Sequence, residues 1–187
     1  IGFGGTDITA HIDKWIRKRK VGGAVLFSRN ISTLKQLAEF NRKLHALTTN
    51  NIPIFLALDQ EGGNVVRVKK GALLLPGNMA LGATRSPTLS YVAGQALSID
   101  LRRLGFNMNL APVLDVNSNP NNPVIGVRSY GENPQLVSTL GSWYVRGQQE
   151  MGIASVAKHF PGHGDTRGDS HFSMPSIDAD IYRLNKI

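Results

Sequence analysis

The chain has 187 residues, of which 41% are hydrophobic, and it contains no cysteine. This length and composition fit one ordinary globular domain with a hydrophobic core, and they exclude disulfide bonds, thiolate nucleophiles and cysteine-ligated metals. Lys and Arg outnumber Asp and Glu by 21 to 13, which gives a formal net charge of +8. This charge attracts polyanions in general, nucleic acid or an acidic cell-wall polymer among them, and identifies no specific partner.

The sequence shows neither a membrane-spanning segment nor a signal peptide. No apolar run approaches the roughly 18 residues that a membrane-spanning helix needs, so we expect no membrane span. Residues 1–5 have neither an initiator Met nor the basic-then-apolar order of a signal peptide, so we expect a cut or processed N-terminus. The densest basic run, residues 17–20, lies where the first helix is expected to end, and cations there suit the helix dipole. We interpret it as a solvated helix end.

Short apolar runs alternate along the chain with longer segments of helical period, which predicts parallel strands joined by crossover helices. The predicted strands are residues 24–27, 54–58, 108–114 and 154–157, with residues 1–3 as the end of an earlier strand. The predicted helices have apolar faces formed in turn by Ile8, Ile12, Trp15 and Ile16; by Leu34, Leu37, Leu44 and Leu47; by Leu89, Ala93, Leu97, Leu101 and Leu104; and by Leu136, Val137, Leu140 and Tyr144. The last three helices have expected start signals at Ser32, Ser86–Pro87 and Asn133–Pro134.

Polar and ionisable residues follow every predicted strand, at 28–30, 59–63, 115–117 and 158–159. In a (β/α)8 barrel the carboxyl ends of the strands face one common mouth, whereas an open sheet would spread these residues along a crevice. No G-x-G-x-x-G follows the first strand and no G-x-x-x-x-G-K-[ST] occurs, which argues against nucleotide-binding folds. We therefore predict the α/β class and a (β/α)8 TIM-type barrel, of which residues 1–187 hold the first part, about five of eight βα units.

Two segments are candidate functional loops. Residues 117–132 are rich in Asn, Pro and Gly, which predicts ordered turns, and loops of this length in a compact domain are usually functional. Residues 158–171, KHFPGHGDTRGDSH, contain three His, two Asp, one Lys and one Arg between Gly and Pro residues. Such a density of titratable groups is unusual for a merely solvated turn.

Asp169 and His171 are two positions apart, so in an extended segment their side chains point the same way. The carboxylate can then fix the imidazole tautomer and raise its basicity, which makes His171 a candidate general acid/base. Two alternatives remain open on spacing alone. The first is a metal site built from the His and Asp residues of this loop, although no H-x-H or H-E-x-x-H spacing supports it. The second is a structural role, in which His163 ties the loop to backbone carbonyls.

KHFPGHGDTRGDSH resembles the loop that is typical of glycoside hydrolase family 3, in the branch of β-N-acetylglucosaminidases that act on peptidoglycan-derived sugars. Three other stretches resemble the same branch in the same order: LALDQEGGNVVR at 56–67, LPGNMALGA at 75–83 and NPVIGVRSYGENP at 122–134. Together they cover nearly the whole chain. The resemblance implies that residues 1–187 are part of the family's N-terminal barrel domain. The implied activity removes terminal, non-reducing β-linked N-acetylglucosamine from a small saccharide or muropeptide, without a cofactor, a metal or nucleic acid.

The resemblance also implies which residues contact the sugar: Asp59, Arg67, Arg128, Lys158 and His159. Charged donors and acceptors that converge on hydroxyl or acetamido groups suit a polar ligand. Without the resemblance, Asp59 is interpreted as an N-cap after a strand and Arg128 as part of a loop salt bridge. Asn64 departs from the family pattern, because many relatives have Arg at this position.

His171 matches the family's acid/base and Asp169 its partner, which implies a retaining mechanism with an Asp–His pair as proton donor instead of the usual second carboxylate. The nucleophile is a separate Asp, expected beyond Ile187 on a C-terminal remainder of the same protein, and nothing places Asp115 or Asp165 in that role. We therefore expect the isolated chain not to turn over substrate. Alternatives are a non-catalytic sugar-binding fragment and another family 3 β-glycosidase. The basic charge favours the periplasm or surface of a bacterium over the cytoplasm.

Overall fold

The computed structural model describes residues 1–48, 52–169, 172, 174–177 and 179–184. Within these residues the strands form one parallel sheet in the order β1 (Gly23–Val25), β2 (Phe55–Leu58), β3 (Met108–Asn109) and β4 (Ala154–Ser155). Each strand pairs with the next strand along the chain, for example Ala24 with Leu56 and Leu58 with Asn109. Parallel pairing in sequence order is the arrangement of successive units of a βα barrel. The predicted α/β class is confirmed.

The strands are shorter than the apolar runs that predict them. The run at 108–114 pairs as a strand only at its first two residues, since Pro112 has no N–H to donate to a ladder. The run then returns to the sheet at Val113, which bridges Lys158 in parallel. The predicted earlier strand is present only as a parallel bridge between Gly2 and Val25.

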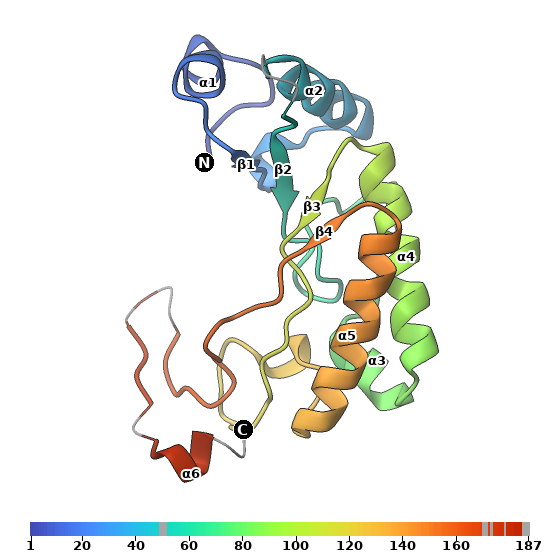
Figure 1. Cartoon of the computed structure of the whole chain (residues 1–187), viewed down its shortest axis with the longest axis vertical. Coiled ribbons are helices and arrows are strands. Elements are labelled where there is room, and N and C mark those ends of the chain that lie inside the picture. The colour runs from blue at the N-terminus through green and yellow to red at the C-terminus, as the bar shows by residue number, and fades with distance from the viewer. Residues whose placement is uncertain (49–51, 170–171, 173, 178, 185–187) are drawn as a thin grey trace.

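Helices connect the strands and cover the sheet (Figure 1). In chain order they are α1 (Ala10–Asp13), a π-helical turn at Lys14–Lys18, a 3-10 turn at Ser28–Asn30, α2 (Leu34–Ala46), α3 (Asn78–Thr84), α4 (Pro87–Arg103), a 3-10 turn at Gly126–Arg128, α5 (Pro134–Glu150) and α6 (Ile181–Leu184). The apolar periodicity does not predict α3 or α6, because helices of 7 and 4 residues are too short to show a helical period.

Three details of the predicted helices are wrong. Trp15 is 37% exposed although Ile12 and Ile16 are buried. Trp15 and Ile16 both lie in the π-helical turn, whose wider winding changes which residues share a face with Ile12. Leu89 is 50% exposed, since the buried face of α4 begins instead at Ser90. Thr33, not Ser32, caps α2 through a hydrogen bond from the N–H of Gln36.

Other signals are confirmed. Ser86 caps α4 and Asn133 caps α5, each with Pro as the next residue. The basic run at 17–20 is exposed and spans the end of the π-helical turn, as expected of a solvated helix end.

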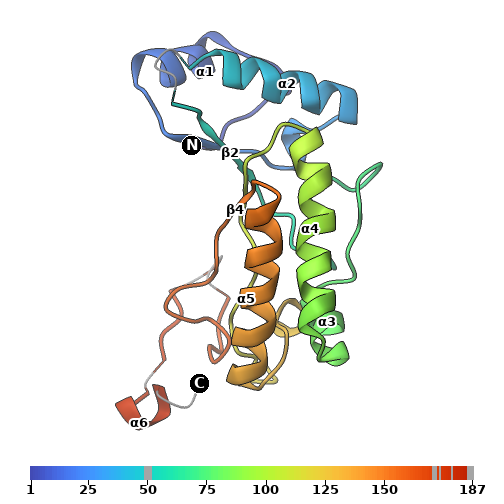
Figure 2. The ribbon, with the colours of Figure 1, turned by 45° about the vertical axis from the view of Figure 1, so that its right-hand side comes forward.

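Helices α4 and α5 lie side by side, as both ribbon views show (Figures 1 and 2). Their close approach depends on glycine. A Cβ added at Gly94 of α4 would lie 2.4 Å from the carbonyl oxygen of Tyr144, and one added at Gly147 of α5 would lie 2.2 Å from that of Tyr91. The core below them contains Leu26, Leu56, Leu58, Leu97 and Leu140, all at most 1% exposed.

In the described part of the chain, no helix combines the length and the apolar character that crossing a membrane requires.

Candidate functional site

The carboxyl ends of the strands carry a group of paired charges that we call the strand-end cluster. Asp59 and Glu61 follow β2, and Lys158 and His159 follow β4. Asp115 ends the segment after β3, Arg67 follows the turn after Glu61, and Arg128 ends the 3-10 turn before α5. Parallel strands bring their carboxyl ends to one edge, so segments up to 99 residues apart in sequence meet here. The cluster consists of Asp59, Glu61, Arg67, Asp115, Arg128, Lys158 and His159.

Lys158 joins the two acids of the β2 segment. Its Nζ lies 2.8 Å from Oδ1 of Asp59 and 2.6 Å from Oε1 of Glu61. The other carboxylate oxygen of Asp59 accepts a hydrogen bond of 3.1 Å from Nη2 of Arg67. Cations therefore hold Asp59 from both sides, and its carboxylate is fixed before any ligand arrives.

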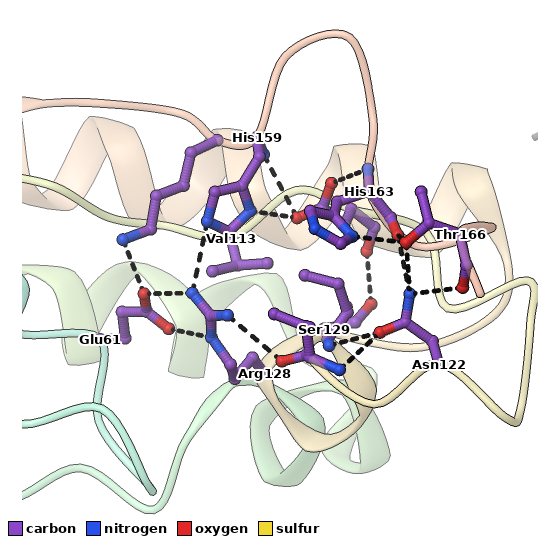
Figure 3. A network of polar contacts seen from close by, with 12 residues as sticks. Glu61, Val113, Asn122, Arg128, Ser129, His159, His163 and Thr166 are labelled. Atoms are coloured by element: carbon purple, nitrogen blue, oxygen red, sulfur yellow. Dashed lines mark hydrogen bonds and ion pairs between the residues drawn. The ribbon is translucent and has the colours of Figure 1, made fainter. Parts of the chain in front are cut away.

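Glu61 and Arg128 form a bidentate ion pair. Both contacts, Nε to Oε2 and Nη2 to Oε1, measure 2.8 Å (Figure 3). The side chain of Glu61 is 3% exposed and that of Arg128 is 15% exposed. Two parallel N–H···O bonds in a site from which water is largely removed fix the plane of the guanidinium.

These contacts keep the buried acids ionised. Burial alone would raise the pKa of Asp59, but the hydrogen bond from Lys158 and the positive charges of Lys158 and Arg67 outweigh it and lower this pKa below its ordinary value. Burial opposes ionisation of Glu61 in the same way, and Arg128 and Lys158 together bring its pKa below the usual range. The cations compensate for the desolvation of both carboxylates.

His159 stands between an acid and a cation. Its Nδ1 lies 2.6 Å from Oδ2 of Asp115, whose side chain is fully buried, and its Nε2 lies 3.3 Å from Nη2 of Arg128. A guanidinium only donates, so this arrangement suits a ring with its proton on Nδ1 and an accepting Nε2. Burial raises the pKa of Asp115, but hydrogen bonds from the His159 ring and from the backbone N–H of His163 lower it further than burial raises it.

Asp115 also anchors the described part of the loop at 158–171, residues 158–169, which we call the glycine-rich loop. Its Oδ1 accepts a 2.6 Å hydrogen bond from the backbone N–H of His163. The buried ring of His163 places Nδ1 2.7 Å from the hydroxyl of Thr166 (Figure 3). This contact is with a hydroxyl group, and the alternative in which His163 ties the loop to backbone carbonyls stays a prediction.

The loop at 117–132 is ordered, as predicted, and packs against the glycine-rich loop. The amide nitrogen of Asn122 donates to the carbonyl oxygens of His163 and Thr166, at 2.8 and 3.0 Å. Its amide oxygen accepts from the N–H groups of Val124 and Ile125, at 2.8 and 2.7 Å. A single buried amide therefore joins the two candidate loops.

The structure brings together all five predicted sugar-contacting residues: Asp59, Arg67, Arg128, Lys158 and His159. The alternative of a loop salt bridge for Arg128 describes its contact with Glu61 correctly. The N-cap alternative for Asp59 is wrong, since no helix begins directly after this residue.

Only one residue of the predicted acid/base pair lies among the described residues. Asp169 is partly buried, whereas His171 lies outside the described residues, so the pair stays a prediction. The neighbouring Asp165 accepts from Arg183 of α6 at 2.6 Å and from the Ser118 hydroxyl at 3.0 Å. A cavity of about 570 Å³ is lined by the glycine-rich loop on one side and by Pro175, Ile177 and Leu184 on the other. Among the described side chains, no three His, Asp or Glu residues gather as metal ligands would.

Sequence reasoning did not assign roles to Glu61 and Asp115, the two most buried acids of the cluster. A signal for both exists. Each lies just after a strand predicted to be buried, and Glu61 is two positions beyond Asp59, so it falls on the same side of an extended chain. An acid in such a position needs a cationic or hydrogen-bonding partner, which the sequence alone does not identify.

Comparison with known proteins gives consistent likenesses. Residues 4–187 match the model of the glycosyl hydrolase family 3 N-terminal domain. The chain is 39% identical to "Beta-hexosaminidase A" of Pseudoalteromonas piscicida, over 97% of this chain and 31% of that protein. A solved β-N-acetylglucosaminidase of glycoside hydrolase family 3 from Paenibacillus sp. str. FPU-7 is 45% identical, with a TM-score of 0.95 over 100% of this chain and 36% of that chain.

Native NagZ from Neisseria gonorrhoeae is 31% identical, with a TM-score of 0.91 over 98% of this chain and 55% of that chain. These structures confirm the predicted fold, in which this sheet is the first part of a barrel. The chain spans between about a third and about half of the length of these relatives.

Proposed function

This chain belongs to glycosyl hydrolase family 3, and from that premise we propose that it forms the sugar-binding and proton-donating part of a β-N-acetylhexosaminidase. The observation that carries the proposal is the strand-end cluster, in which Asp59, Arg67, Arg128, Lys158 and His159 converge from separate segments. The relatives named beta-hexosaminidase and β-N-acetylglucosaminidase support the choice of sugar.

The charge balance of the cluster supports an uncharged ligand. The cluster has three acids, Asp59, Glu61 and Asp115, and three cations, Arg67, Arg128 and Lys158. Each of these cations already pairs with an acid, and Arg128 also faces His159. The net charge of +8 therefore belongs to the rest of the surface. Paired charges with donors and acceptors left over bind hydroxyl and acetamido groups without favouring an anion.

In the proposed reaction, the sugar's hydroxyls bind the cluster and His171, positioned by Asp169, protonates the leaving oxygen. A carboxylate outside these 187 residues attacks the anomeric carbon and forms a glycosyl-enzyme ester. His171 then takes a proton from water, which hydrolyses the ester with overall retention. The substrates would be peptidoglycan-derived saccharides with a terminal, non-reducing β-linked N-acetylglucosamine.

Sugar binding by the isolated chain is the first test. N-Acetylglucosamine should bind, measured by calorimetry or by NMR titration, and glucose should bind about tenfold more weakly, because the acetamido contacts are lost. Equal binding of both sugars would favour another family 3 β-glycosidase. Failure to bind either sugar, with the chain folded, would remove the proposal.

Turnover is the second test. The isolated chain should not hydrolyse a fluorogenic β-N-acetylglucosaminide, since the proposed nucleophile is not among its residues. In a polypeptide that also carries the nucleophile, His171→Ala should slow hydrolysis about 10²- to 10⁴-fold, and NMR should show the β-anomer as the first product. Hydrolysis by the isolated chain at enzymatic rates, abolished by His171→Ala, would contradict the proposed division of roles.

We also propose a periplasmic or cell-surface location, which the excess of basic residues supports. Fractionation of the source cells with an antibody against this chain tests it. Recovery with the cytoplasmic fraction alone would contradict it.

A further inference from the structure

Glu61 sits at the base of a tight turn that fixes its backbone. Its N–H donates to the carbonyl oxygen of Val65 at 2.9 Å, and Gly62 follows with a φ of +92°. A Cβ added at Gly62 would lie 3.0 Å from both the carbonyl oxygen and the Cβ of Leu75. The turn is therefore clamped against the segment before α3, and the Glu61 side chain starts from an immobile point.

The carboxylate of Glu61 is shared between two cations. Oε1 accepts from Lys158 Nζ at 2.6 Å and from Arg128 Nη2 at 2.8 Å, and Oε2 accepts from Arg128 Nε at 2.8 Å. Glu61 is the most buried of the three side chains, at 3% exposed against 13% for Lys158 and 15% for Arg128. The side chains of the two cations are therefore more accessible than that of Glu61.

From this geometry we infer that Glu61 is a positioning residue, which holds Arg128 and Lys158 in the orientation that binds sugar without touching the sugar itself. The inference rests on the proposed function for its sugar-binding part. Glu61 fixes the relative position of two cations that arrive from different loops, one from the turn before α5 and one from the end of β4. A bidentate contact sets the guanidinium plane, which a single contact cannot do.

The two cations depend on Glu61 to different degrees. Lys158 keeps a second acid, Asp59, at 2.8 Å. The remaining contacts of Arg128 are longer, 3.2 Å to the carbonyl oxygen of Val124 and 3.3 Å to Nε2 of His159. Removal of the Glu61 charge should therefore release Arg128 much more than Lys158.

A pocket of about 250 Å³ adjoins this pair, lined by Glu61, Arg128, the turn at 62–64, residues 76–78 and Val127. It gives the released guanidinium a place to turn into. The space beside Arg128 therefore allows its orientation to change when the contact with the carboxylate is lost.

The first experiment measures the position of Arg128 without any sugar. In wild type, the Nε–H of Arg128 should give a distinct NMR signal that exchanges slowly with water. In Glu61→Gln, whose amide keeps the size but loses the charge and one accepting oxygen, this signal should move to the position of exposed arginines and exchange at least about tenfold faster. Glu61→Asp should restore it in part. An unchanged signal in Glu61→Gln would overturn the inference, regardless of the result for sugar binding.

The second experiment measures N-acetylglucosamine binding in a double-mutant cycle. Glu61→Gln should weaken binding about tenfold or more, and Arg128→Gln should weaken it similarly. If Glu61 acts through Arg128, Glu61→Gln should cost much less in the Arg128→Gln background. Additive losses in a folded double variant would show that Glu61 acts elsewhere.

Glu39→Gln is the matched control. Glu39 holds Arg42 by the same bidentate contacts, at 2.7 and 2.8 Å, on the exposed surface of α2. This variant should leave both the Arg128 signal and sugar binding unchanged. Absence of sugar binding in wild type, with a slowly exchanging Arg128 signal that Glu61→Gln abolishes, would reject the proposed function and keep the positioning role.

Discussion

Two Arg–Glu pairs in this chain have nearly the same bond lengths and opposite surroundings. Glu39 and Arg42 lie on α2 with contacts of 2.7 and 2.8 Å and with 47% and 68% of their side chains exposed. Glu61 and Arg128 contact each other at 2.8 Å twice and are 3% and 15% exposed. The geometry of a contact therefore does not reveal its role. Burial and the number of shared partners do.

The exposed pair is local and the buried pair is not. Glu39 and Arg42 are neighbours on one helix turn, held by a secondary structure that exists without them. Glu61 and Arg128 are 67 residues apart, with α3, α4 and β3 between them along the chain, and they join two separate loops. Removing one partner of the exposed pair leaves the other in water, whereas removing one partner of the buried pair leaves an uncompensated charge.

Lys158→Met should give the largest effect, because Lys158 compensates two buried carboxylates at once. The free energy of unfolding, measured with urea, should fall by about 3–5 kcal/mol, as expected when a buried ionic network loses its cation. Lys43→Met is the control, since Lys43 pairs with the exposed Asp7. A loss no larger than in this control would mean that water reaches the cluster freely.

Gly164→Ala tests the contrast between buried and exposed positions for the backbone. A Cβ at Gly164 would lie 1.7 Å from the carbonyl oxygen of Val116, so the glycine-rich loop would have to move away from the chain at Val116, just before the 117–132 loop. We expect a loss of about 1–3 kcal/mol in the free energy of unfolding, the usual cost of overpacking. At the exposed Gly22, where an added Cβ meets nothing within 4 Å, the same change should leave stability nearly unaltered. Equal effects at the two glycines would contradict the close contact between Gly164 and Val116.

Acid should reduce the stability that the strand-end cluster contributes. The folded-state pKa values of Asp59, Glu61 and Asp115 lie below their ordinary values. Their contribution to stability is therefore complete above the unfolded-state pKa values, about 4, and is lost as the pH falls through the lower folded-state values. Urea unfolding from pH 7 down to pH 3 should show this loss, and Glu61→Gln should show less of it. The same pH dependence in both proteins would assign the effect to other carboxylates.

The sequence predicts this architecture well where a pattern is local. Alternating strand and helix periods give the parallel sheet, and Ser86 and Asn133 correctly begin α4 and α5. It fails where a contact depends on distant partners. The apolar spacing that places Leu89 inside contains no information that Ser90 turns toward the carbonyl oxygen of Leu140 instead.

The same limit applies to the candidate site. The residues predicted to contact the sugar follow from motif resemblance, because each motif is a short local string. The partners Glu61 and Asp115 become visible only when strands from different parts of the chain meet. Burial of an acid is a tertiary property, and a single sequence gives only its approximate position along a strand.

Asp165→Asn should have the smallest effect at the site and refines the comparison between buried and exposed pairs. Asp165 combines both characters, since its side chain is 8% exposed while that of its partner Arg183 is 52% exposed. The amide keeps the hydrogen bond with the Ser118 hydroxyl and loses most of the bond with Arg183. We expect a loss of up to about 1 kcal/mol in the free energy of unfolding, which added salt should reduce, since one partner is solvated. A loss as large as that of Lys158→Met would show that burial of one carboxylate is sufficient and that sharing between two cations adds little.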